Sequence, residues 1–340
     1  MRERLRIIIT GLLILNFGMF VVIVVKTIRQ THLQQGYVKA DFIRDYYATN
    51  PAPASTLILG DSITAFGITP LAFEKAVSLA IPGATHMTVL AEWVRYRKSH
   101  PAPNCLLVAT AGNQEYYKLF GELFLRNALF TLDQADSLFV NSAKDQRYPS
   151  VAYSRFAFLT AMFIERYILP SPTLLARASL ALGLKTSETT LYTEIKHSIE
   201  ENRGFLSRNR RAPSKPMADD YRFRHLFHEF QPDETDDYYL NQIAKHLEQE
   251  RIPLIYVQMP TLPSAEPQPP VYMNARMEHI RQILAPYPNA HIVQIPAPSN
   301  SDDFRDAIHL SNKGAIDFSN RLATTVSQFC QNADKASDSP

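Results

Sequence analysis

The sequence predicts an α/β protein whose parallel sheet is covered by helices on both faces. Short apolar runs typical of fully buried strands recur along the chain, and segments with helical periodicity separate them. This alternation is typical of parallel strands, because a helix or another long crossover must connect them. The predicted strands are Thr56–Leu59, Cys105–Ala111, Pro253–Met259 and His291–Ile295.

Helical patterns fill most of the chain between these strands. They are predicted at Pro70–Val77, Met87–Lys98, Asp236–Gln249, Met273–Leu284 and Asn312–Phe329. From residue 116 to residue 235 the alternation stops and the pattern is mainly helical. We therefore predict an α/β domain formed by residues 56–115 and 236–330, a helical insertion at 116–235, and a disordered tail at 331–340.

The composition excludes several classes of protein. The chain has 340 residues, of which 46% are hydrophobic and 20% charged, so it is too polar for a multispanning membrane protein and too apolar for a disordered one. Its 35 basic and 33 acidic side chains give a formal charge of +2. Because nucleic-acid-binding proteins usually carry a larger basic excess, we expect no nucleic-acid partner.

The N-terminus carries a candidate membrane segment. Ile7–Val25 contains no charged side chain, and its nineteen residues would form a helix roughly 28 Å long, close to the thickness of a bilayer core. A cleaved signal peptide has an apolar stretch of only about 7–15 residues. We therefore predict an uncleaved transmembrane anchor within residues 1–30. A helical, polar stalk at Thr31–Tyr47 and a proline-rich linker up to residue 55 follow it.

The charges that flank this segment favour one orientation. Three arginines precede it and two basic residues follow it, which favours a cytoplasmic N-terminus by one charge. We predict a single-pass protein of the inner or plasma membrane, whose residues 30–340 lie on the periplasmic or extracytoplasmic side.

Two cysteines, Cys105 and Cys330, are too few for a disulfide-rich scaffold or a four-cysteine metal site. Cys105 opens a predicted strand, and Cys330 follows a predicted helix that should run back to the same edge of the sheet. A disulfide is therefore possible in an oxidising compartment, while two buried thiols are the default interpretation.

A serine follows the first predicted strand. The segment Leu57–Thr64 reads LILGDSIT, so Ser62 lies at the carboxyl end of that strand, where open α/β sheets bind their ligands. Gly60 allows a sharp turn and a close approach of another backbone segment. Asp61 beside it is the kind of acidic residue that is common near helix starts.

A histidine and an aspartate stand near the other end of the chain. The spacing Asp306-x-x-His309 lets Asp306 accept a hydrogen bond from the imidazole Nδ1–H, which leaves Nε2 to take a proton from a serine hydroxyl. A helix should begin just after them, with Ser311 or Asn312 as its cap.

Two further segments offer hydrogen-bond donors at the same sheet edge. Gly83 stands where a second strand should finish, and Asn113 follows the strand that ends at Ala111. The backbone N–H groups of Ser62 and Gly83 and the carboxamide of Asn113 could together stabilise an oxyanion.

Taken in order, Gly60-Asp61-Ser62, Gly83, Asn113 and Asp306-x-x-His309 resemble the motifs of the SGNH/GDSL hydrolase superfamily. The resemblance implies a three-layer, flavodoxin-like SGNH sandwich. It also implies that Ser62 is the nucleophile, that His309 is the base, and that Asp306 orients this base. Gly83 and Asn113 would complete the oxyanion hole with the N–H of Ser62.

One block differs from the family pattern, and another is similar to one branch of the family. The third block is usually Gly-x-Asn-Asp, but here residues 111–114 read AGNQ. The segment 310–314, LSNKG, is similar to the membrane-anchored branch that transfers acyl groups in the cell envelope. That branch includes the D-alanyl-transfer protein of teichoic acid synthesis and the alginate-acetylation proteins, which also carry one N-terminal anchor.

These observations predict a membrane-anchored serine esterase that hydrolyses acyl esters outside the cytoplasm. One alternative is an O-acyltransferase or acyl-carrier step that modifies an envelope polysaccharide, with an acylated glycan as substrate and a multispanning O-acyltransferase as partner. Another is a catalytically decayed SGNH scaffold. The chemistry requires no metal or organic cofactor. The pair His225-x-x-His228 lacks the further ligands of a metal site, and the chain has no P-loop or G-x-G-x-x-G motif.

Overall fold

A computed structural model describes much of the chain, in two compact units. The larger unit holds the described residues from 39 to 111 and from 195 onward, and the smaller unit holds residues 35–38 and 172–194. The described residues are 35–49, 51–111, 172–207, 230–262 and 268–330.

The described part of the larger unit contains a sheet of five parallel strands in the order β2-β1-β3-β4-β5. The predicted α/β class with a parallel sheet is thus confirmed. In β1 and β3 every residue is buried, as expected for central strands that helices cover on both sides. The strands are β1 Thr56–Gly60, β2 Ala76–Ser78, β3 Cys105–Ala109, β4 Leu254–Gln258 and β5 Ala290–Gln294.

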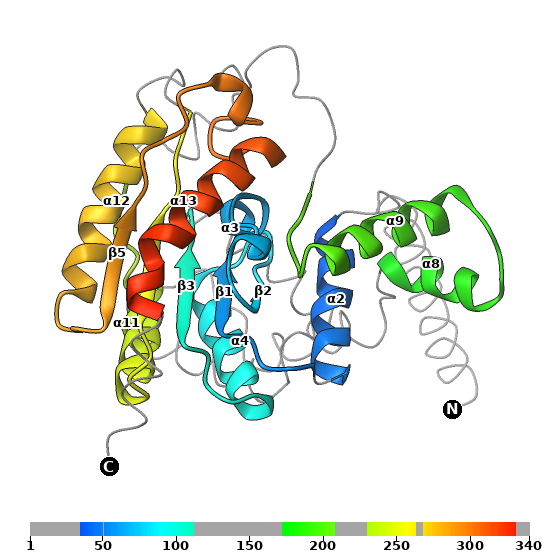
Figure 1. Cartoon of the computed structure of the whole chain (residues 1–340), viewed down its shortest axis with the longest axis horizontal. Helices are drawn as coiled ribbons and strands as arrows, with labels where there is room; N and C mark the ends of the chain where they lie inside the picture. Colours follow the sequence, from blue (N-terminus) through cyan, green and yellow to red (C-terminus); the bar gives the residue numbers. More distant parts are fainter. Residues whose placement is uncertain (1–34, 50, 112–171, 208–229, 263–267, 331–340) are drawn as a thin grey trace, which may run out of the picture. The chain divides into compact units, whose positions relative to one another are not determined.

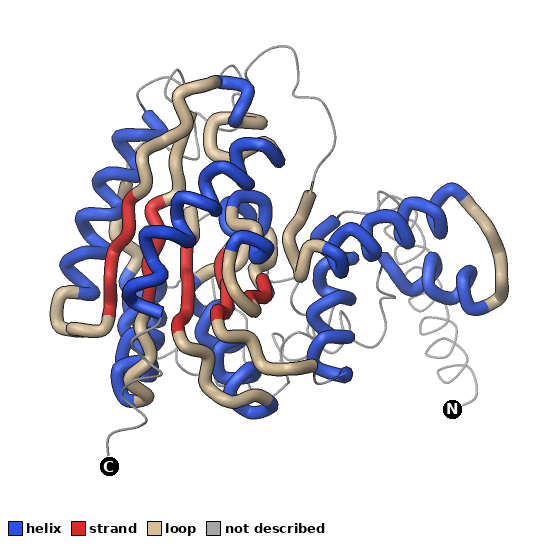
Figure 2. Tube along the Cα trace, in the orientation of Figure 1, coloured by secondary structure: helices blue, strands red, loops and turns tan. Residues whose placement is uncertain are grey.

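Helices cover both faces of this sheet (Figures 1 and 2). On one face α3 (Ser62–Gly67) packs against α13 (Asn312–Cys330). On the other face α11 (Glu234–Gln249) packs against both α4 (His86–Ser99) and α12 (Gln268–Leu284). The strand order explains the two layers of helices. The crossover from β1 to β2 and the later crossovers run in opposite directions along the sheet, and because each crossover is right-handed, their helices lie on opposite faces.

The helix predicted at Pro70–Val77 is wrong. This stretch forms a single 3-10 turn at Pro70–Ala72 and then strand β2, which pairs with β1. Lys75 has a left-handed φ of 45°, which ends any helix before the strand begins. Pairing with a buried neighbouring strand therefore overrides the local helical pattern.

Helix α2 (Gln35–Thr49) is helical as predicted, but it is packed rather than being a solvated stalk. Val38 and Ile43 are fully buried. The buried ammonium of Lys39 donates hydrogen bonds to the backbone carbonyl oxygens of Ser78 and Gly204. The helix is thereby held against the end of β2 and against the chain that follows α9.

Within the predicted insertion, the structure describes α8 (Pro172–Ala181) and α9 (Ser187–Glu201). No described helix is both long and apolar enough to cross a bilayer. The predicted anchor at Ile7–Val25, the tail at 331–340 and much of the insertion lie outside the described residues.

Cys105 and Cys330 form a disulfide, so the default interpretation of two buried thiols is wrong. Cys105 begins β3 and is fully buried, while Cys330 ends α13. The helix returns across the sheet to the edge where β3 begins, and the two Cα atoms are 5.2 Å apart. The bond closes a sequence separation of 225 residues, a length for which a crosslink strongly restricts the unfolded chain.

We expect the double variant Cys105→Ala/Cys330→Ala to lose about 2–5 kcal/mol of unfolding free energy, because its unfolded chain regains the entropy of an open loop. Denaturant unfolding of both proteins measures this loss. Dithiothreitol should lower the midpoint of the wild type and leave that of the double variant unchanged, and an equal response of the two proteins would contradict the stabilising role of the disulfide.

Candidate active site

Ser62 lies at the carboxyl end of β1, as the first residue of α3. Strand order reverses at this point, since β1 has β2 on one side and β3 on the other. In doubly wound sheets such a switch point forms a crevice at the carboxyl ends of the strands, and ligands bind there. Ser62 itself is partly exposed.

The turn before Ser62 requires a glycine. Gly60 has a φ of +145°, and a Cβ atom there would lie 2.0 Å from the carbonyl oxygen of Ala109. This oxygen ends β3, and it accepts hydrogen bonds from the N–H of Asp61 (3.3 Å) and the hydroxyl of Thr64 (2.5 Å). Strand β3 thus holds the turn that presents the serine.

The structure brings Ser62, His309 and Asp306 together. The Oγ of Ser62 is 2.9 Å from Nε2 of His309, although 247 residues separate them in sequence. On the other side of the imidazole, Nδ1 lies 2.9 Å from each carboxylate oxygen of Asp306. The three groups have the order and spacing of a serine–histidine–aspartate triad.

The surroundings of Asp306 favour its charged form. Burial alone would raise the pKa of this carboxyl, but the hydrogen bond from His309 and those from the backbone N–H groups of Ile308 and His309 hold it below its usual range. The carboxylate therefore stays charged near neutral pH and can stabilise an imidazolium. The ring of Phe66 packs edge-on against His309, with 5.8 Å between ring centroids, and limits how the imidazole can turn.

Asp61, which the sequence presented only as a common first-turn acid, links two segments of the site, the serine turn and the chain after β3. One carboxylate oxygen caps α3 by accepting from the N–H of Ile63 (3.0 Å), and the other accepts from the N–H of Ala111 (2.7 Å). Burial raises the pKa of this carboxyl, and the two N–H groups and the charge of Arg276 oppose that rise. Asp61 thus fastens the segment after β3 to the turn that carries Ser62.

The structure places two of the three candidate oxyanion donors at this edge. As the first residue of α3, Ser62 has one of the initial N–H groups that helical bonding leaves without a partner within the helix. Gly83, with a φ of +80°, stands two residues beyond Ile81, whose N–H donates to the carbonyl of Gly60 (2.9 Å). Asn113 lies outside the described residues.

Two described residues of the predicted insertion, Leu206 and Ser207, also lie beside the site. The N–H of Leu206 donates to the carbonyl of Ala65 in α3 (2.9 Å). The carboxamide of Asn312 at the start of α13 donates to the hydroxyl of Ser207 (2.7 Å). Ser311 caps α13 through the N–H of Gly314, so the first of the two predicted caps is correct.

Behind this edge lies a buried polar cluster that no sequence pattern predicted, made by His86, Thr110, Asp236, Tyr256 and Arg276. These residues come from five separate segments and form no motif, so only the fold reveals the cluster. Among the described residues, no group of three or more histidine, cysteine, aspartate or glutamate side chains could hold a metal ion. The pair His225 and His228 lies outside the described residues.

A scan of the chain against models of known protein families finds no match, and neither does a search of curated proteins. The function therefore has to be inferred from the geometry and chemistry of the site.

We expect Gly60→Ala to destabilise the protein and displace Ser62, because the added methyl group would collide with a backbone carbonyl. Gly183→Ala is the matched control. Gly183 also has a positive φ, +71°, but nothing lies within 4 Å of the added Cβ, so only strain of about 1 kcal/mol is expected. Thermal unfolding of both variants gives the comparison, and equal losses would contradict the close contact at Gly60.

Proposed function

We propose that this protein is a serine esterase that hydrolyses acyl esters through Ser62, His309 and Asp306. The observation that carries the proposal is the continuous hydrogen-bonded line from the Ser62 hydroxyl through the His309 imidazole to the Asp306 carboxylate. An exposed serine in a turn has no need of such partners, whereas a nucleophilic serine needs both a base and a group that orients it.

The geometry supports a two-step acyl transfer. Nε2 of His309 takes the hydroxyl proton as the Oγ of Ser62 attacks the ester carbonyl. The imidazolium that forms is stabilised by Asp306, and it then gives its proton to the departing alcohol as the acyl–serine ester forms. Water, activated by the same imidazole, attacks the acyl-enzyme, so that the acid leaves and Ser62 regains its proton.

The oxyanion that forms in each step needs donors on the side of Ser62 away from His309. We assign this role to the N–H groups of Ser62 and Gly83 and to the carboxamide of Asn113. The placement of Ser62 and Gly83 at one edge of the sheet supports the first two. Losing one such donor typically lowers kcat by about 10²–10³-fold.

The triad residues and the topology of the sheet both support membership of the SGNH/GDSL superfamily. The strand order 2-1-3-4-5 and the helices on both faces of the sheet fit its three-layer, flavodoxin-like sandwich. The third block, residues 111–114, departs from the family pattern. The N–H of Ala111, the first residue of this block, binds Asp61, so the block is still tied to the serine turn.

We place the enzyme on the outer side of the membrane, anchored by the apolar segment Ile7–Val25. The disulfide between Cys105 and Cys330 supports this location, since such bonds persist in oxidising compartments and are rare in the cytosol.

We expect Ser62→Ala to abolish hydrolysis of p-nitrophenyl acetate, because the nucleophile is removed while the fold keeps its contacts. Ser99→Ala is the control, since Ser99 is an exposed serine at the end of α4. A fluorophosphonate probe should label the wild type and the control but not Ser62→Ala.

Two other outcomes of these assays would contradict the proposal. Hydrolysis or labelling that persists in Ser62→Ala would place the activity elsewhere in the chain. A wild type that is neither active nor labelled would favour the decayed scaffold over both catalytic hypotheses.

A second function uses the same residues with a polysaccharide hydroxyl in place of water. The segment 310–314, which resembles the envelope acyl-transfer branch, favours it. In that case deletion of the gene for this protein should remove acyl groups from an envelope polymer. The protein should then act together with a multispanning O-acyltransferase. Complementing the deletion with wild type and with Ser62→Ala, and measuring polymer-bound acyl groups, tests it. Restoration by both proteins would exclude transfer through Ser62.

A further inference from the structure

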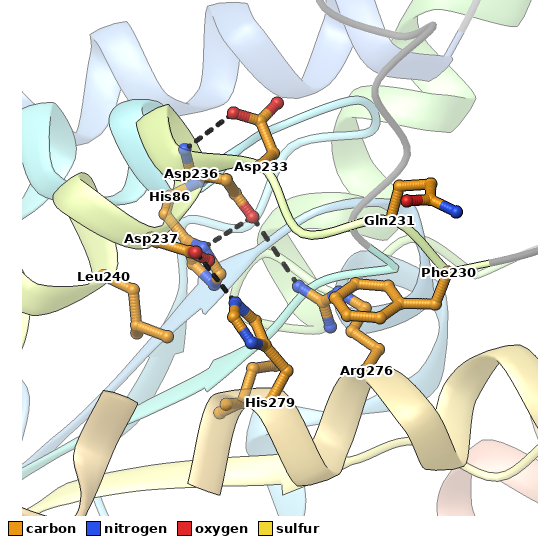
Figure 3. A pocket seen from close by; sticks show the side chains of 10 residues that line it. His86, Phe230, Gln231, Asp233, Asp236, Asp237, Leu240, Arg276 and His279 are labelled. Atoms are coloured by element: carbon orange, nitrogen blue, oxygen red, sulfur yellow. Dashed lines mark hydrogen bonds and ion pairs between the residues drawn. The ribbon is translucent and has the colours of Figure 1, made fainter. Parts of the chain in front are cut away.

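A buried polar cluster lies behind the serine turn, on the face of the sheet covered by α4, α11 and α12. Figure 3 shows part of it: Asp236 lies between the imidazole of His86 and the guanidinium of Arg276. His86, Thr110, Tyr256 and Arg276 are each at most 2% exposed. Burying so many polar groups is costly unless each finds a partner, so their arrangement calls for a functional or structural reason.

Arg276 donates hydrogen bonds to Thr110, the residue just beyond the end of β3. Its Nη1 donates to the carbonyl oxygen of Thr110 (2.6 Å), and its Nη2 donates to the hydroxyl of the same residue (2.7 Å). Nη2 also donates to the phenol of Tyr256 in β4 (3.1 Å). The paired residues of β3 and β4 end at Val108 and Tyr256, so the guanidinium supplies a fixed donor where the ladder stops.

The residue held in this way is adjacent to the serine turn. The peptide that joins Thr110 to Ala111 carries both the carbonyl that Arg276 binds and the N–H that donates to Asp61. Asp61 in turn caps the helix that begins with Ser62. A planar peptide transmits a tilt at one end to the other, so three successive contacts connect Arg276 to the nucleophile.

The other side of the cluster holds the helix that follows the Gly83 turn. One oxygen of Asp236 accepts from the backbone N–H of His86, the first residue of α4, and the other lies 2.8 Å from the imidazole Nδ1. The second imidazole nitrogen is 3.0 Å from the phenol oxygen of Tyr256. The same cluster thus contacts the backbone at the start of α4 as well as the backbone just after β3.

The charges in the cluster reinforce these contacts. Burial lowers the pKa of His86, but the nearby Asp236 and Tyr256 raise it to about 9 overall, which favours the charged imidazole. The pKa of Tyr256 is lowered despite burial, because both Arg276 and His86 face its oxygen. The charge of Arg276 also opposes the rise that burial causes in the pKa of Asp61.

We propose that Arg276 is a positioning residue for the Ser62 site, acting through Thr110 on the segment that binds Asp61. This role rests on the proposed serine hydrolase function. Arg276 touches neither Ser62 nor the reacting atoms. It sets the orientation of the peptide that fastens the serine turn, so its loss moves the nucleophile relative to its oxyanion donors without changing how the substrate is bound.

The test compares full-length variants in hydrolysis of p-nitrophenyl acetate, with kcat and KM measured separately alongside the midpoint of thermal unfolding. We expect Arg276→Met to lower kcat by about 100-fold and to change KM by less than about threefold, since small displacements at a reacting group cost rate rather than binding. Arg276→Lys keeps the charge but not the forked donor geometry, so its kcat should lie between those of the wild type and Arg276→Met. Arg281→Met, at an exposed arginine of α12, is the control and should match the wild type.

A second pair of variants decides the matter if Arg276→Met fails to fold. Thr110→Val removes the hydroxyl that Arg276 binds while keeping the side-chain shape, and it should lower kcat, whereas Thr110→Ser should restore it. Variants that unfold at lower temperature but keep wild-type kcat would overturn the positioning role while the proposed function stands. A wild type without any activity that depends on Ser62 would overturn both.

Discussion

The candidate site depends on the parallel pairing of β1 with β3. This pairing sets Gly60 opposite Ala109, so close that a larger residue at position 60 would collide with the carbonyl oxygen of Ala109. The same oxygen accepts hydrogen bonds from Asp61 and Thr64, so a neighbouring strand holds the turn that presents Ser62. A loop held only by its own residues would have lower local stability and would present the serine less rigidly.

The site contains two buried aspartates, one beside Ser62 in sequence and one beyond the His309 imidazole, and their surroundings give them different roles. Asp306 receives hydrogen bonds from an imidazole and from backbone N–H groups, which keep its pKa low and its charge available to His309. Asp61 is buried among backbone N–H donors, and it joins the turn to the segment after β3. Asp306 therefore stabilises the charge of the His309 imidazole, and Asp61 holds the backbone of the serine turn in position.

Local patterns predicted the features that depend on local chemistry. The strands predicted at Thr56–Leu59 and His291–Ile295 match β1 and β5 to within a residue or so, because a short apolar run between turn residues has few alternatives. The helix predicted at Pro70–Val77 was wrong, since β2 is defined by its pairing with β1. The pairing of the two cysteines was left open, because only the path of α13 brings Cys330 back to the start of β3.

The sequence by itself determined the parallel α/β class, the serine turn after the first strand, and the Asp306–His309 pair, because each of these is encoded within a few neighbouring residues. Only the tertiary structure decided that Ser62 and His309 meet, that Asp61 binds the segment after β3, and that Arg276 lies behind it. These contacts join residues tens to hundreds of positions apart. Their distances follow from how helices pack on a twisted sheet, and no short stretch of sequence carries that information.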